Sequence, residues 1–576
     1  MQSTDNRLVP HHHMDGRLDR LSSMLRRRGV LSPAFEPYGG VRGLAAYGPV
    51  GGTIRSRFIS TWLDHWAQHG DLVEIDAPVV TPYEVLDASG HVDQFTDPIA
   101  TCSACGETHR ADHLIGEEAE GWSIEDIRAS FIEDPPGCTS CGSRVFDEIQ
   151  EQNLMFTTNI GIGAGARRGY LRPETAQGMF TAFPMLHRHF RERLPFGAMQ
   201  VGRGYRNEIS PRQGMIRLRE FSMAEIEYFI DPEATWARDR SSWPDEAITL
   251  VPSEGGERRE VLAQALDAGL IRHPIVAHFM AWTLKFALRI GLDADRLRFR
   301  QHGVDEMAHY AQDCWDLEVN GSYGWIECVG IAHRGCHDLQ SHEDATGHQF
   351  RSFRPFDEPM EVHRKGWTLE GSSAGPAFRA DAPAVRAAVE ALAADVRFPT
   401  TVEVEDGRRF TIEAEHVKSI DRTEVVRGTW FLPHVIEPAF GIDRLIWHLL
   451  DHAYDEQVTE EGTITKLRLH EDLAPYDVLV APLFTKDGMD DVAMVTFEML
   501  LQIPGLRPML DTSRSIGRRY ARADEIGIPW SVTIDHQTLE DETVTIRRRD
   551  DQVQVRVARA ELVPAFTHGH VASLFD

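Results

Sequence analysis

The stretch from Met199 to Glu225 constrains the fold most, because two strand-like segments flank a short loop. Pro211 and Gly214 lie in that loop, which predicts a β-hairpin. Side chains alternate across a strand, so we expect Arg206 and Glu208 on the face that also carries Gly202 and Gly204. On the second strand the same alternation groups three further residues: Arg219, Phe221 and Glu225.

This predicted face combines two guanidiniums, an aromatic ring and two carboxylates. A guanidinium binds phosphate oxygens and stacks on purines, and phenylalanine offers a second stacking surface. The paired glycines are expected to leave space above the strand. The pattern therefore predicts a nucleotide lying on a sheet, with a solvated charged hairpin face as the alternative. A weaker sign of the same chemistry is Arg444, in the first turn of an expected helix, where a phosphate is a plausible partner.

Four of the seven cysteines form two Cys-x-x-Cys pairs. The two-residue spacing lets both thiolates of a pair reach one ion, and two pairs complete a tetrahedral site. A four-cysteine site leaves no open position, so we predict structural zinc; four unrelated thiols are the alternative. The expected ligands are Cys102, Cys105, Cys138 and Cys141, with Gly106 and Gly142 allowing the tight turns.

The length of 576 residues suggests three or four domains, and the 42% of hydrophobic residues excludes a disordered or fibrous chain. No apolar run is long enough for a membrane helix, and no signal-peptide pattern opens the sequence, so we expect a cytoplasmic protein. Residues 1–15 are polar with a histidine run, and we expect them to be disordered or tag-like.

The charge is strongly acidic, with 89 Asp and Glu against 60 Lys and Arg and a net charge of −29. Only five of the basic residues are lysines. A heavily acidic surface is tolerable at molar salt, where charges are screened over a few ångströms, so we expect a salt-accumulating cytosol. An ordinary acidic enzyme is the alternative.

Apolar residues at every fourth position predict a helix from Ile54 to Trp66, ended by Gly70. A strand from Val73 to Val80, broken at Pro78, is expected next. Residues 345–430 look acidic and irregular, apart from a helix at Ala382–Ala394. From Pro475 onward strand and helix patterns alternate, which predicts a separate α/β domain. The expected boundaries are 16–100, 151–344 and 431–470 for a divided core, 101–150 for the cysteine module, 345–430 for an insertion and 471–576 for the last domain.

Short motifs along the chain resemble class II glycyl-tRNA synthetases of the dimeric type found in archaea, eukaryotes and some bacteria. The resemblance runs from about Arg28 to Leu562. The two most specific motifs are Leu171-Arg-Pro-Glu-Thr-Ala-Gln-Gly178 and Arg206-Asn-Glu-Ile-Ser-Pro-Arg212. The others are Tyr38-Gly-Gly, Tyr47-Gly-Pro, Asn153-Leu-Met-Phe, Arg219-Glu-Phe221, Arg300-Gln-His302, Glu306-Met-Ala-His-Tyr-Ala311, Asp313-Cys-Trp-Asp316 and Val435-Ile-Glu-Pro438.

The resemblance implies an α+β multidomain protein: an antiparallel catalytic sheet, an inserted zinc module and a C-terminal α/β anticodon-binding domain. It also implies a homodimer with an interface near the Ile54–Trp66 helix. The implied reaction activates glycine with ATP, releasing pyrophosphate, and then transfers the glycyl group to the 3′-hydroxyl of the terminal adenosine of glycine tRNA. Positioning and charge stabilisation would drive it without a covalent enzyme intermediate.

The same resemblance assigns roles to single residues. Arg206 and Arg444 are the expected catalytic arginines, at the α- and γ-phosphates, and Phe221 stacks the adenine. Mg²⁺ is expected with ATP. The implied ATP-binding residues are Arg206, Asn207, Glu208, Ile216, Arg219, Phe221, Glu327, Cys328, Gly441 and Arg444. The implied glycine-binding residues are Arg110, Glu174, Phe221, Glu225, Glu437 and Gly441, where carboxylates hold the ammonium and leave no room for a side chain.

Two positions depart from the family pattern. Ala439 stands where a serine is usual, and the loss of one neutral hydrogen bond costs about 0.5–1.5 kcal/mol. His333 stands where aspartate or asparagine is common. Either departure could weaken activity.

The tRNA must bind an acidic protein, because residues 475–576 hold 11 basic and 16 acidic residues. We expect contacts from two arginine clusters, one on a helix face and one at a strand end; a solvated helix face is the alternative. The clusters comprise Arg514, Arg518, Arg519, Arg522, Arg547 and Arg549.

Two other functions stay open at this stage. A non-catalytic paralogue acting as an RNA-binding or polymerase accessory subunit would be expected to lose the ATP-binding arginines. A class II synthetase for another amino acid would not crowd its pocket with Glu174, Glu225 and Glu437.

Overall fold

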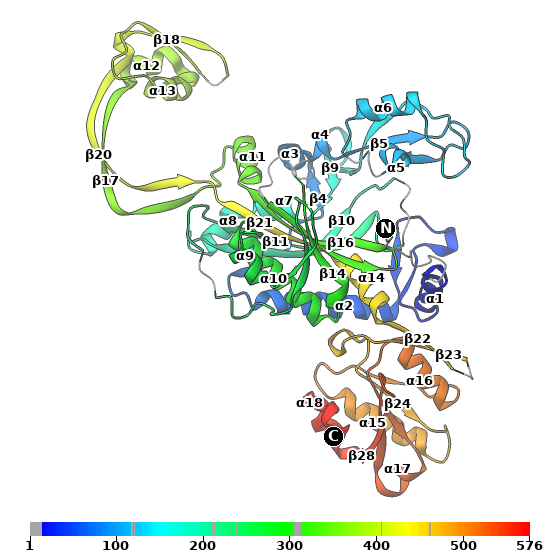
Figure 1. The fold of residues 1–576 in the computed structure, drawn as a ribbon. Helices are drawn as coiled ribbons and strands as arrows, with labels where there is room; N and C mark the ends of the chain where they lie inside the picture. Colours follow the sequence, from blue (N-terminus) through cyan, green and yellow to red (C-terminus); the bar gives the residue numbers. More distant parts are fainter. Residues whose placement is uncertain are drawn as a thin grey trace, which may run out of the picture. The chain divides into compact units, whose positions relative to one another are not determined.

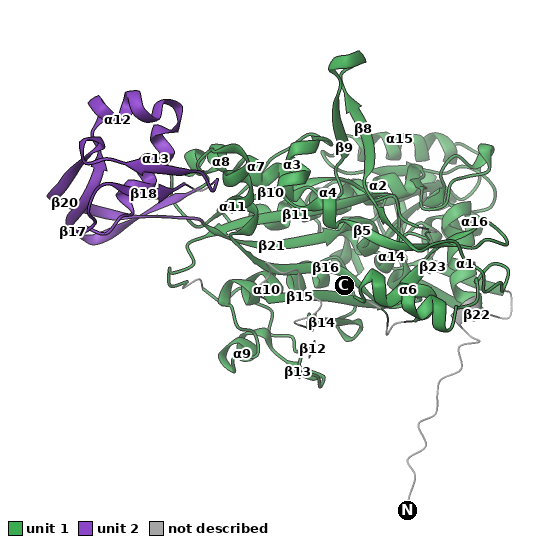
Figure 2. Cartoon of the chain, turned by 90° about the horizontal axis from the view of Figure 1, so that it is seen from above, with its two compact units in different colours: residues 1–350, 433–576 green, residues 351–432 purple. Residues whose placement is uncertain are grey.

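The computed structural model describes residues 14–116, 119, 121–209, 211, 214–236, 239–303, 313–404, 406–459 and 462–575. It divides into two compact units, one formed by residues 1–350 and 433–576 and the other by residues 351–432 (Figure 2). Residues 1–13, most of the tag-like segment, lie outside the described residues, as do Arg212 and the motif at 306–311. Within the described ranges no helix combines the length and the apolar character that a membrane crossing requires.

A nine-stranded sheet forms the centre of the larger unit (Figure 1). Its neighbours pair antiparallel except for β12 with β14 and β10 with β3, which are parallel. The strands are, in spatial order, Arg258–Glu260 (β13), Ile248–Val251 (β12), Leu297–Gln301 (β14), Asp313–Gly321 (β15), Gly324–Gly335 (β16), His434–Gly441 (β21), Glu220–Ile230 (β11), Phe196–Tyr205 (β10) and Leu72–Glu74 (β3).

The hairpin predicted from the sequence is confirmed as the antiparallel pair β10 and β11. Its register places Gly204 opposite Phe221 and Gln200 opposite Glu225. From Phe196 to Gln200 and from Ser222 to Ile230 every residue is buried, so both faces of this part of the sheet are covered. The sheet therefore offers a rigid floor at its centre.

Helices α2 (Pro49–Ala67) and α10 (Pro274–Arg289) cover one face of that sheet (Figure 1). The ring of Phe440 on β21 contacts Trp62 at 5.6 Å and Trp66 at 5.8 Å between ring centroids, and Phe286 at 6.2 Å. Aromatic pairs of this kind add about 0.5–1.5 kcal/mol beyond their area burial. The predicted helix face is thus confirmed, although the helix ends at Ala67, three residues before Gly70.

The single strand expected from Val73 to Val80 is wrong. The segment forms two short strands in different sheets: β3 pairs with β10, and β4 (Val80–Pro82) pairs with β9 (Arg167–Leu171). Pro78 lacks the N–H that a ladder needs, and the carbonyl of Ala77 accepts a hydrogen bond from Nη1 of Arg172 at 2.7 Å. Because the backbone bonds a side chain there, the chain changes sheets.

Smaller elements surround the sheet in the same unit. Two three-stranded sheets have the orders β4-β9-β8 and β6-β5-β7, and the second belongs to the cysteine module. The remaining strands are Leu31–Pro33 (β1), Ala45–Tyr47 (β2), Thr96–Thr101 (β5), Thr108–Arg110 (β6), Gln150–Asn153 (β7), Phe156–Ile160 (β8), Tyr454–Thr459 (β22) and Gly462–Leu467 (β23). The helices are Met14–Arg27 (α1), Tyr83–Ala88 (α3), His91–Gln94 (α4), Ala111–Ile115 (α5), Ile124–Glu133 (α6), Ala176–Thr181 (α7), Phe183–His189 (α8), Leu262–Asp267 (α9), His337–Thr346 (α11) and Ile442–Ala453 (α14).

The alternation after Pro475 forms the predicted α/β fold. A five-stranded sheet of order β25-β24-β26-β27-β28 has its first three strands parallel. Val480, Val532 and Leu500 are fully buried in the core between sheet and helices. The elements are Val478–Pro482 (β24), Met489–Leu501 (α15), Pro508–Leu510 (β25), Ile516–Glu525 (α16), Trp530–Ile534 (β26), His536–Asp541 (α17), Thr543–Arg548 (β27), Gln554–Ala558 (β28) and Leu562–Thr567 (α18).

The description of residues 345–430 as irregular is also wrong. The smaller unit contains a long two-stranded ladder of β17 (Ser352–Leu369) and β20 (Val417–Phe431), with a compact end of β18 (Thr400–Glu403), β19 (Arg409–Ile412), α12 (Gly371–Phe378) and α13 (Ala382–Glu390). A two-stranded ladder leaves most side chains on both faces exposed, so no apolar alternation marks it in the sequence. Helix α13 ends four residues earlier than expected.

Candidate active site

A pocket of about 170 Å³ opens on the sheet face opposite α2 and α10. Its walls come from the hairpin, from the irregular pairing of β15 and β16, and from the first turn of α14. The lining residues are Arg206, Glu208, Met215, Ile216, Arg217, Leu218, Phe221, Ser222, Met223, Glu225, Glu327, Cys328, Ala439, Phe440, Gly441, Asp443 and Arg444.

One row of paired residues crosses the sheet and reaches the pocket at Glu225 and Ala439. Gly330 pairs with both Asp316 and Ala439, and Ala439 pairs in turn with Glu225. Paired residues point to the same face, so two small residues separate two carboxylates. A Cβ atom at Gly330 would meet Oδ1 of Asp316 at 3.6 Å. Small residues therefore lie between an acid on β15 and an acid on β11.

The space over the paired glycines is filled by protein, which corrects the prediction that it is open. A Cβ atom at Gly202 would lie 2.1 Å from Nη2 of Arg172, and one at Gly204 would lie 2.6 Å from Cε2 of Phe221. The two glycines therefore make room for a buried guanidinium and an aromatic ring.

Arg206 and Glu208 lie beyond the end of β10, so the predicted strand alternation does not place them. The backbone N–H of Arg206 donates to the carbonyl of Arg219 at 2.9 Å, which closes the hairpin end. The guanidinium of Arg206 lies 5.5 Å from the ring centroid of Phe221 and 5.2 Å from that of Phe95. Arg206 thus reaches the pocket by stacking, whereas Asn207 does not line it and bonds Leu154 through its backbone.

Arg444 lies in the first turn of α14, as expected, and its side chain crosses the pocket. Nε donates to the carbonyl of Ile216 at 3.1 Å and Nη1 to the carbonyl of Glu327 at 2.8 Å. The Glu327 carboxylate lies 3.7 Å from Nη1. Burial raises the pKa of the neighbouring Cys328 thiol, so this cysteine packs as a neutral group.

Arg217 lines the pocket and Arg219 does not, a distinction that the sequence analysis missed. Arg219 donates to the carbonyls of Glu208 and Arg42 at 2.9 Å each and so ties down the loop. Nε of Arg217 lies 3.9 Å from the Glu208 carboxylate. Alternation would have grouped both arginines with Phe221, but β11 begins only at Glu220, so the pattern does not extend to them.

Glu225 lines the pocket, and Glu437, which does not line it, lies beside Glu225 with a carboxylate oxygen within 4.8 Å. Glu225 is 2% exposed and accepts a hydrogen bond from the Thr175 N–H at 2.7 Å. Burial, with the charges of Glu437 and Glu174, raises the pKa of Glu225 to about 8. Glu437 accepts from Nη1 of Arg334 at 2.6 Å, and burial raises the pKa of its carboxyl. Two of the three acids that the resemblance implies for glycine binding, Glu225 and Glu437, thus lie next to each other.

Glu174 and Arg110 line other surfaces. Glu174 borders an adjoining cavity of about 480 Å³, 3.4 Å from His91. Burial raises the pKa of Glu174, but His91 and other donors outweigh burial, so the pKa lies below its usual range. Arg110, on β6 of the cysteine module, donates from Nε to Asp112 at 3.1 Å. Arg110 does not line the pocket, but it lies close enough to Glu208, which does, for the two charges to interact.

Glu227 is a buried acid that the sequence analysis missed. Strand alternation places it on the face of Glu225, and one carboxylate oxygen each from Glu225, Glu227 and Glu437 lies within 4.8 Å of the others. The Ala-Glu-Ile-Glu run from Ala224 carries the signal, because an acid at every second strand position on a buried face is unusual.

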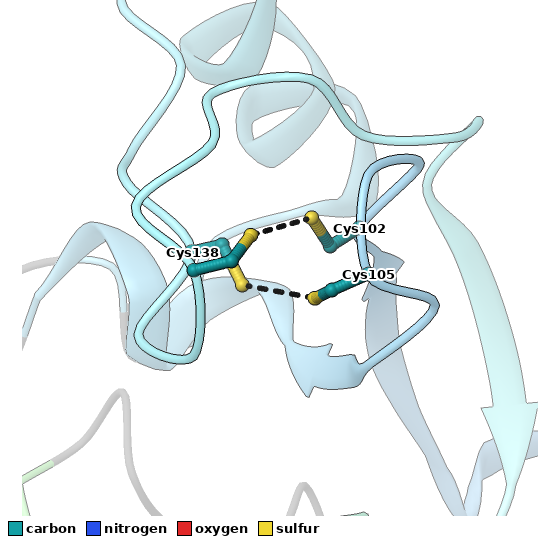
Figure 3. Close-up of side chains that lie close together, drawn as sticks. Cys102, Cys105 and Cys138 are labelled. Atoms are coloured by element: carbon teal, nitrogen blue, oxygen red, sulfur yellow. Dashed lines mark hydrogen bonds between the residues drawn. The ribbon is translucent and has the colours of Figure 1, made fainter.

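The four paired cysteines converge on one point, as Figure 3 shows for the two facing loops. Sγ of Cys102 lies 3.6 Å from that of Cys141, and Sγ of Cys105 lies 3.8 Å from that of Cys138. Zinc–sulfur bonds of about 2.3 Å in a tetrahedron give sulfur separations of about 3.8 Å, so the donor set fits zinc. Gly106 and Gly142 have the positive φ angles of +74° and +76° that the tight turns need.

The expected tRNA contacts do not form one exposed patch. Arg519, Arg547 and Arg549 are 2–4% exposed, and all three donate to groups inside the domain. Arg547 donates to both oxygens of Asp524 at 2.9 Å. Arg522 pairs with Asp511, and only Arg514 and Arg518 of the six are exposed. The predicted helix face is wrong in part, because α16 begins at Ile516 and Arg514 precedes it with a φ of +66°, and because Arg519 is buried whereas Arg518 is exposed.

The two family departures have different surroundings. Ala439 lies on the pocket floor beside Glu225. His333 pairs with Ile436, one residue out of step with the Ala332–Glu437 pair, so it points to the opposite face. Its Nε2 lies 3.2 Å from Nδ1 of His434, and burial lowers its pKa to about 3. The proposed link between His333 and the pocket is therefore indirect at most.

The fold and the site define a class II tRNA synthetase. Residues 161–261 match the tRNA synthetase class II core domain (G, H, P, S and T), and residues 477–568 match the anticodon binding domain. A solved structure of Giardia lamblia prolyl-tRNA synthetase in complex with prolyl-adenylate has the same fold, with a TM-score of 0.52 and 12% identity over 97% of this chain and 80% of that one.

Full-length relatives give the particular family. The chain is 42% identical to glycine–tRNA ligase of Methanocaldococcus jannaschii over 569 residues, which cover 95% of this chain and 97% of the relative. It is 43% identical to that of Methanothermobacter thermautotrophicus, covering 95% and 98%, and 43% identical to that of Archaeoglobus fulgidus, covering 95% of each. The chain belongs to the glycine–tRNA ligase family.

Proposed function

We propose that the chain activates glycine with ATP in this pocket and transfers the glycyl group to the 3′ end of glycine tRNA. The observation that carries the proposal is the juxtaposition, on one sheet face, of three arginines and a stacking ring with buried carboxylates over a floor of small residues. This arrangement suits an anionic nucleotide next to a small cationic group.

The arginines divide the triphosphate between them. Arg206, at the hairpin end, holds the α-phosphate as the carboxylate of glycine attacks it, and Arg444 with Arg217 holds the departing pyrophosphate. Phe221 stacks on the adenine. The base then takes the place that Arg206 occupies against the ring in the free protein. A guanidinium already fixed by backbone carbonyls, as Arg444 is, loses little freedom on binding.

Glu225 and Glu437 hold the ammonium of glycine, assisted by Glu174 from the adjoining cavity. Ala439 and Gly330 close the floor beneath the α-carbon, so a methyl group meets backbone atoms. Selectivity for glycine then comes from exclusion rather than from an added contact. Ala439 offers no hydroxyl, so the ammonium depends on the carboxyls alone.

Two metal ions belong to the proposal. The carboxylates of Glu208 and Glu327 line the pocket and suit Mg²⁺, which prefers oxygen ligands and would neutralise phosphate charge. The four cysteines suit a structural Zn²⁺ that stabilises the module around it. Without the metal ion, the module would hold four thiols close together with no ion to bind them all.

We infer a homodimer, a cytoplasmic location and a salt-rich working medium, the last supported by the net charge of −29. The proposed domains keep the boundaries given from the sequence, except that the insertion takes the bounds of the smaller unit, 351–432. For tRNA contact in the last domain, exposure favours Arg514 and Arg518 over the four arginines that are engaged inside it.

Transfer of radiolabelled glycine to a glycine tRNA transcript tests the proposal. Charging of that transcript, abolished in Arg206→Ala, is the expected result. Charging with alanine or serine at a similar rate would contradict the assigned pocket, and charging of no tRNA by folded protein would favour the non-catalytic alternative.

A further inference from the structure

The buried acid Glu227 has no role in the chemistry described above. It is fully buried, and neither of its carboxylate oxygens has a hydrogen-bond donor among the described residues. Glu225, two residues before it on β11, accepts from Thr175, and Glu437 on β21 accepts from Arg334. Of the three clustered acids, Glu227 is therefore the one whose charge no donor stabilises.

The charges around this cluster do not balance. Besides Glu227, the acids in and next to this cluster are Glu225 on the same strand, Glu437 on β21, Asp338 on α11 and Glu174 in the segment before α7. Two buried arginines, Arg334 and Arg172, lie near these acids, and both donate to other groups. Arg334 from β16 also donates to Asp338 at 2.9 Å and 3.0 Å, and Arg172 donates to backbone carbonyls.

Two imidazoles complete the surroundings. His91 lies against Glu174, and His342 lies 2.9 Å from Oε1 of Gln177, where burial lowers the pKa of the His342 imidazole. Three ionised carboxylates within 4.8 Å of one another are too repulsive to coexist beside one shared guanidinium. The cluster must therefore hold a proton, and its titration belongs to the group as a whole.

We propose that Glu227 holds this proton in the free protein and that the ammonium of glycine displaces it. A neutral Glu227 carries one O–H that can donate to the neighbouring carboxylate, which gives a hydrogen-bond partner to one of its two otherwise orphaned oxygens. An ammonium entering beside Glu225 and Glu437 adds a positive charge, which favours the ionised form of every acid in the cluster. In the absence of glycine, burial and the charge of Glu437 raise the pKa of Glu227 and so favour its neutral form.

The proton balance of this step is simple. Free protein holds Glu227 as COOH; glycine enters as a zwitterion with its ammonium; Glu227 becomes COO⁻ and the proton passes to solvent. Binding therefore tightens as the pH rises through the pKa of the cluster, because proton loss accompanies it. Glu227 acts as a positioning residue that supplies negative charge only when the ligand's positive charge has arrived.

This inference rests on the proposed function, and calorimetry separates the two. Glycine is titrated into the full chain at pH 7 in phosphate, HEPES and Tris, whose ionisation heats differ, and the number of protons released is obtained from the slope. We expect about 0.5–1 proton per bound glycine for the wild type, since one group of the cluster titrates. In E227Q we expect less than about 0.2, because the amide cannot ionise.

A kinetic readout accompanies the calorimetry. The KM for glycine of the wild type should fall by several-fold between pH 6.5 and 8.5, whereas that of E227Q should be higher at pH 8.5 and nearly flat, with kcat changed less than KM. E220Q is the matched control, because Glu220 is on the same strand but pairs with Arg203 on the other face. It should behave as the wild type.

The possible outcomes distinguish failure of this inference from failure of the proposed function. Glycine binding by the wild type without proton release, or equal release by wild type and E227Q, overturns the inference while leaving the proposed function intact. Binding that is pH-independent but competes with K⁺ at constant ionic strength shows a bound cation in place of the proton, and also overturns it. Should E227Q fail to fold, the wild-type proton count still decides. Absence of glycine binding and of charging by folded wild type contradicts the proposed function itself.

Discussion

The ring of Phe221 lies directly across Gly204, where a Cβ atom would come within 2.6 Å of Cε2 and 2.7 Å of Cζ. The two residues are register partners on β11 and β10, so the contact is fixed by strand pairing. Glycine at this position therefore sets the height of the stacking ring above the sheet, and Arg206 lies on that ring at 5.5 Å.

Substituting Gly204→Ala should displace the Phe221 ring and weaken ATP binding. A lost aromatic stack of about 0.5–1.5 kcal/mol corresponds to a rise in the KM for ATP of roughly 2- to 12-fold. Steady-state exchange kinetics at saturating glycine measure it. Gly52→Ala, in helix α2 with open space around its Cα, is the control and should leave the KM unchanged. An unaltered KM in Gly204→Ala would show that the ring does not stack the base.

Alanine variants of Arg217 and Arg219 should have different defects, one in ATP use and the other in stability. Arg217→Ala removes a charged donor from the pocket, and a charge-assisted bond of about 1.5–3 kcal/mol predicts a roughly 10- to 150-fold loss in kcat/KM for ATP. Arg219→Ala frees the carbonyls of Glu208 and Arg42 and should lower the thermal midpoint instead. Thermal unfolding and ATP kinetics on both variants make the comparison. The reverse pattern would restore Arg219 as the nucleotide ligand.

The cysteine module should contain one zinc ion per chain. Cys105→Ser should lose that ion and open residues 101–150 to proteolysis, because a structural zinc contributes folding energy directly. Elemental analysis and limited proteolysis measure the two effects. Cys336→Ser removes a cysteine outside the cluster and should retain the metal. Equal metal content in both variants would refute the four-cysteine site.

The arginines of the last domain should divide into structural and RNA-contacting members. Arg547→Ala leaves Asp524 buried without its partner, which costs about 3–5 kcal/mol, so this variant should lose stability. Arg514→Ala with Arg518→Ala should leave stability unchanged and weaken tRNA binding, more strongly at low salt. Denaturant unfolding and filter binding test the pair. Undiminished tRNA affinity in the double variant would move the RNA surface elsewhere.

Strand pairing and cysteine spacing were predictable because both are local. The hairpin followed from alternation in residues 199–225, and the four-sulfur cluster from two short spacings. The failures have a common physical origin in contacts between distant segments. The space over Gly202 is filled by Arg172, and Arg547 is buried by Asp524, 23 residues away; no period in the sequence carries that information.

Segment ends account for the other differences. Alternation misassigned Arg219 because the strand starts one residue later. The ladder of β17 and β20 escaped notice because most side chains on both of its faces are exposed, so no apolar alternation marks it. The position of Glu227 beside Glu225 was predictable, since two residues are one period of a strand. That its carboxylate is buried without a hydrogen-bond donor is visible only in the structure.

Glycine-dependent ATP–pyrophosphate exchange tests the central claim most directly. Purified protein is assayed with glycine, alanine and serine between 0.1 and 3 M KCl, after size-exclusion chromatography shows that it is folded. The account predicts exchange with glycine alone, carried by the small-residue floor at Ala439 and Gly330 and by the acids beside it. Equal exchange with alanine, or none with any amino acid at any salt concentration, would contradict it.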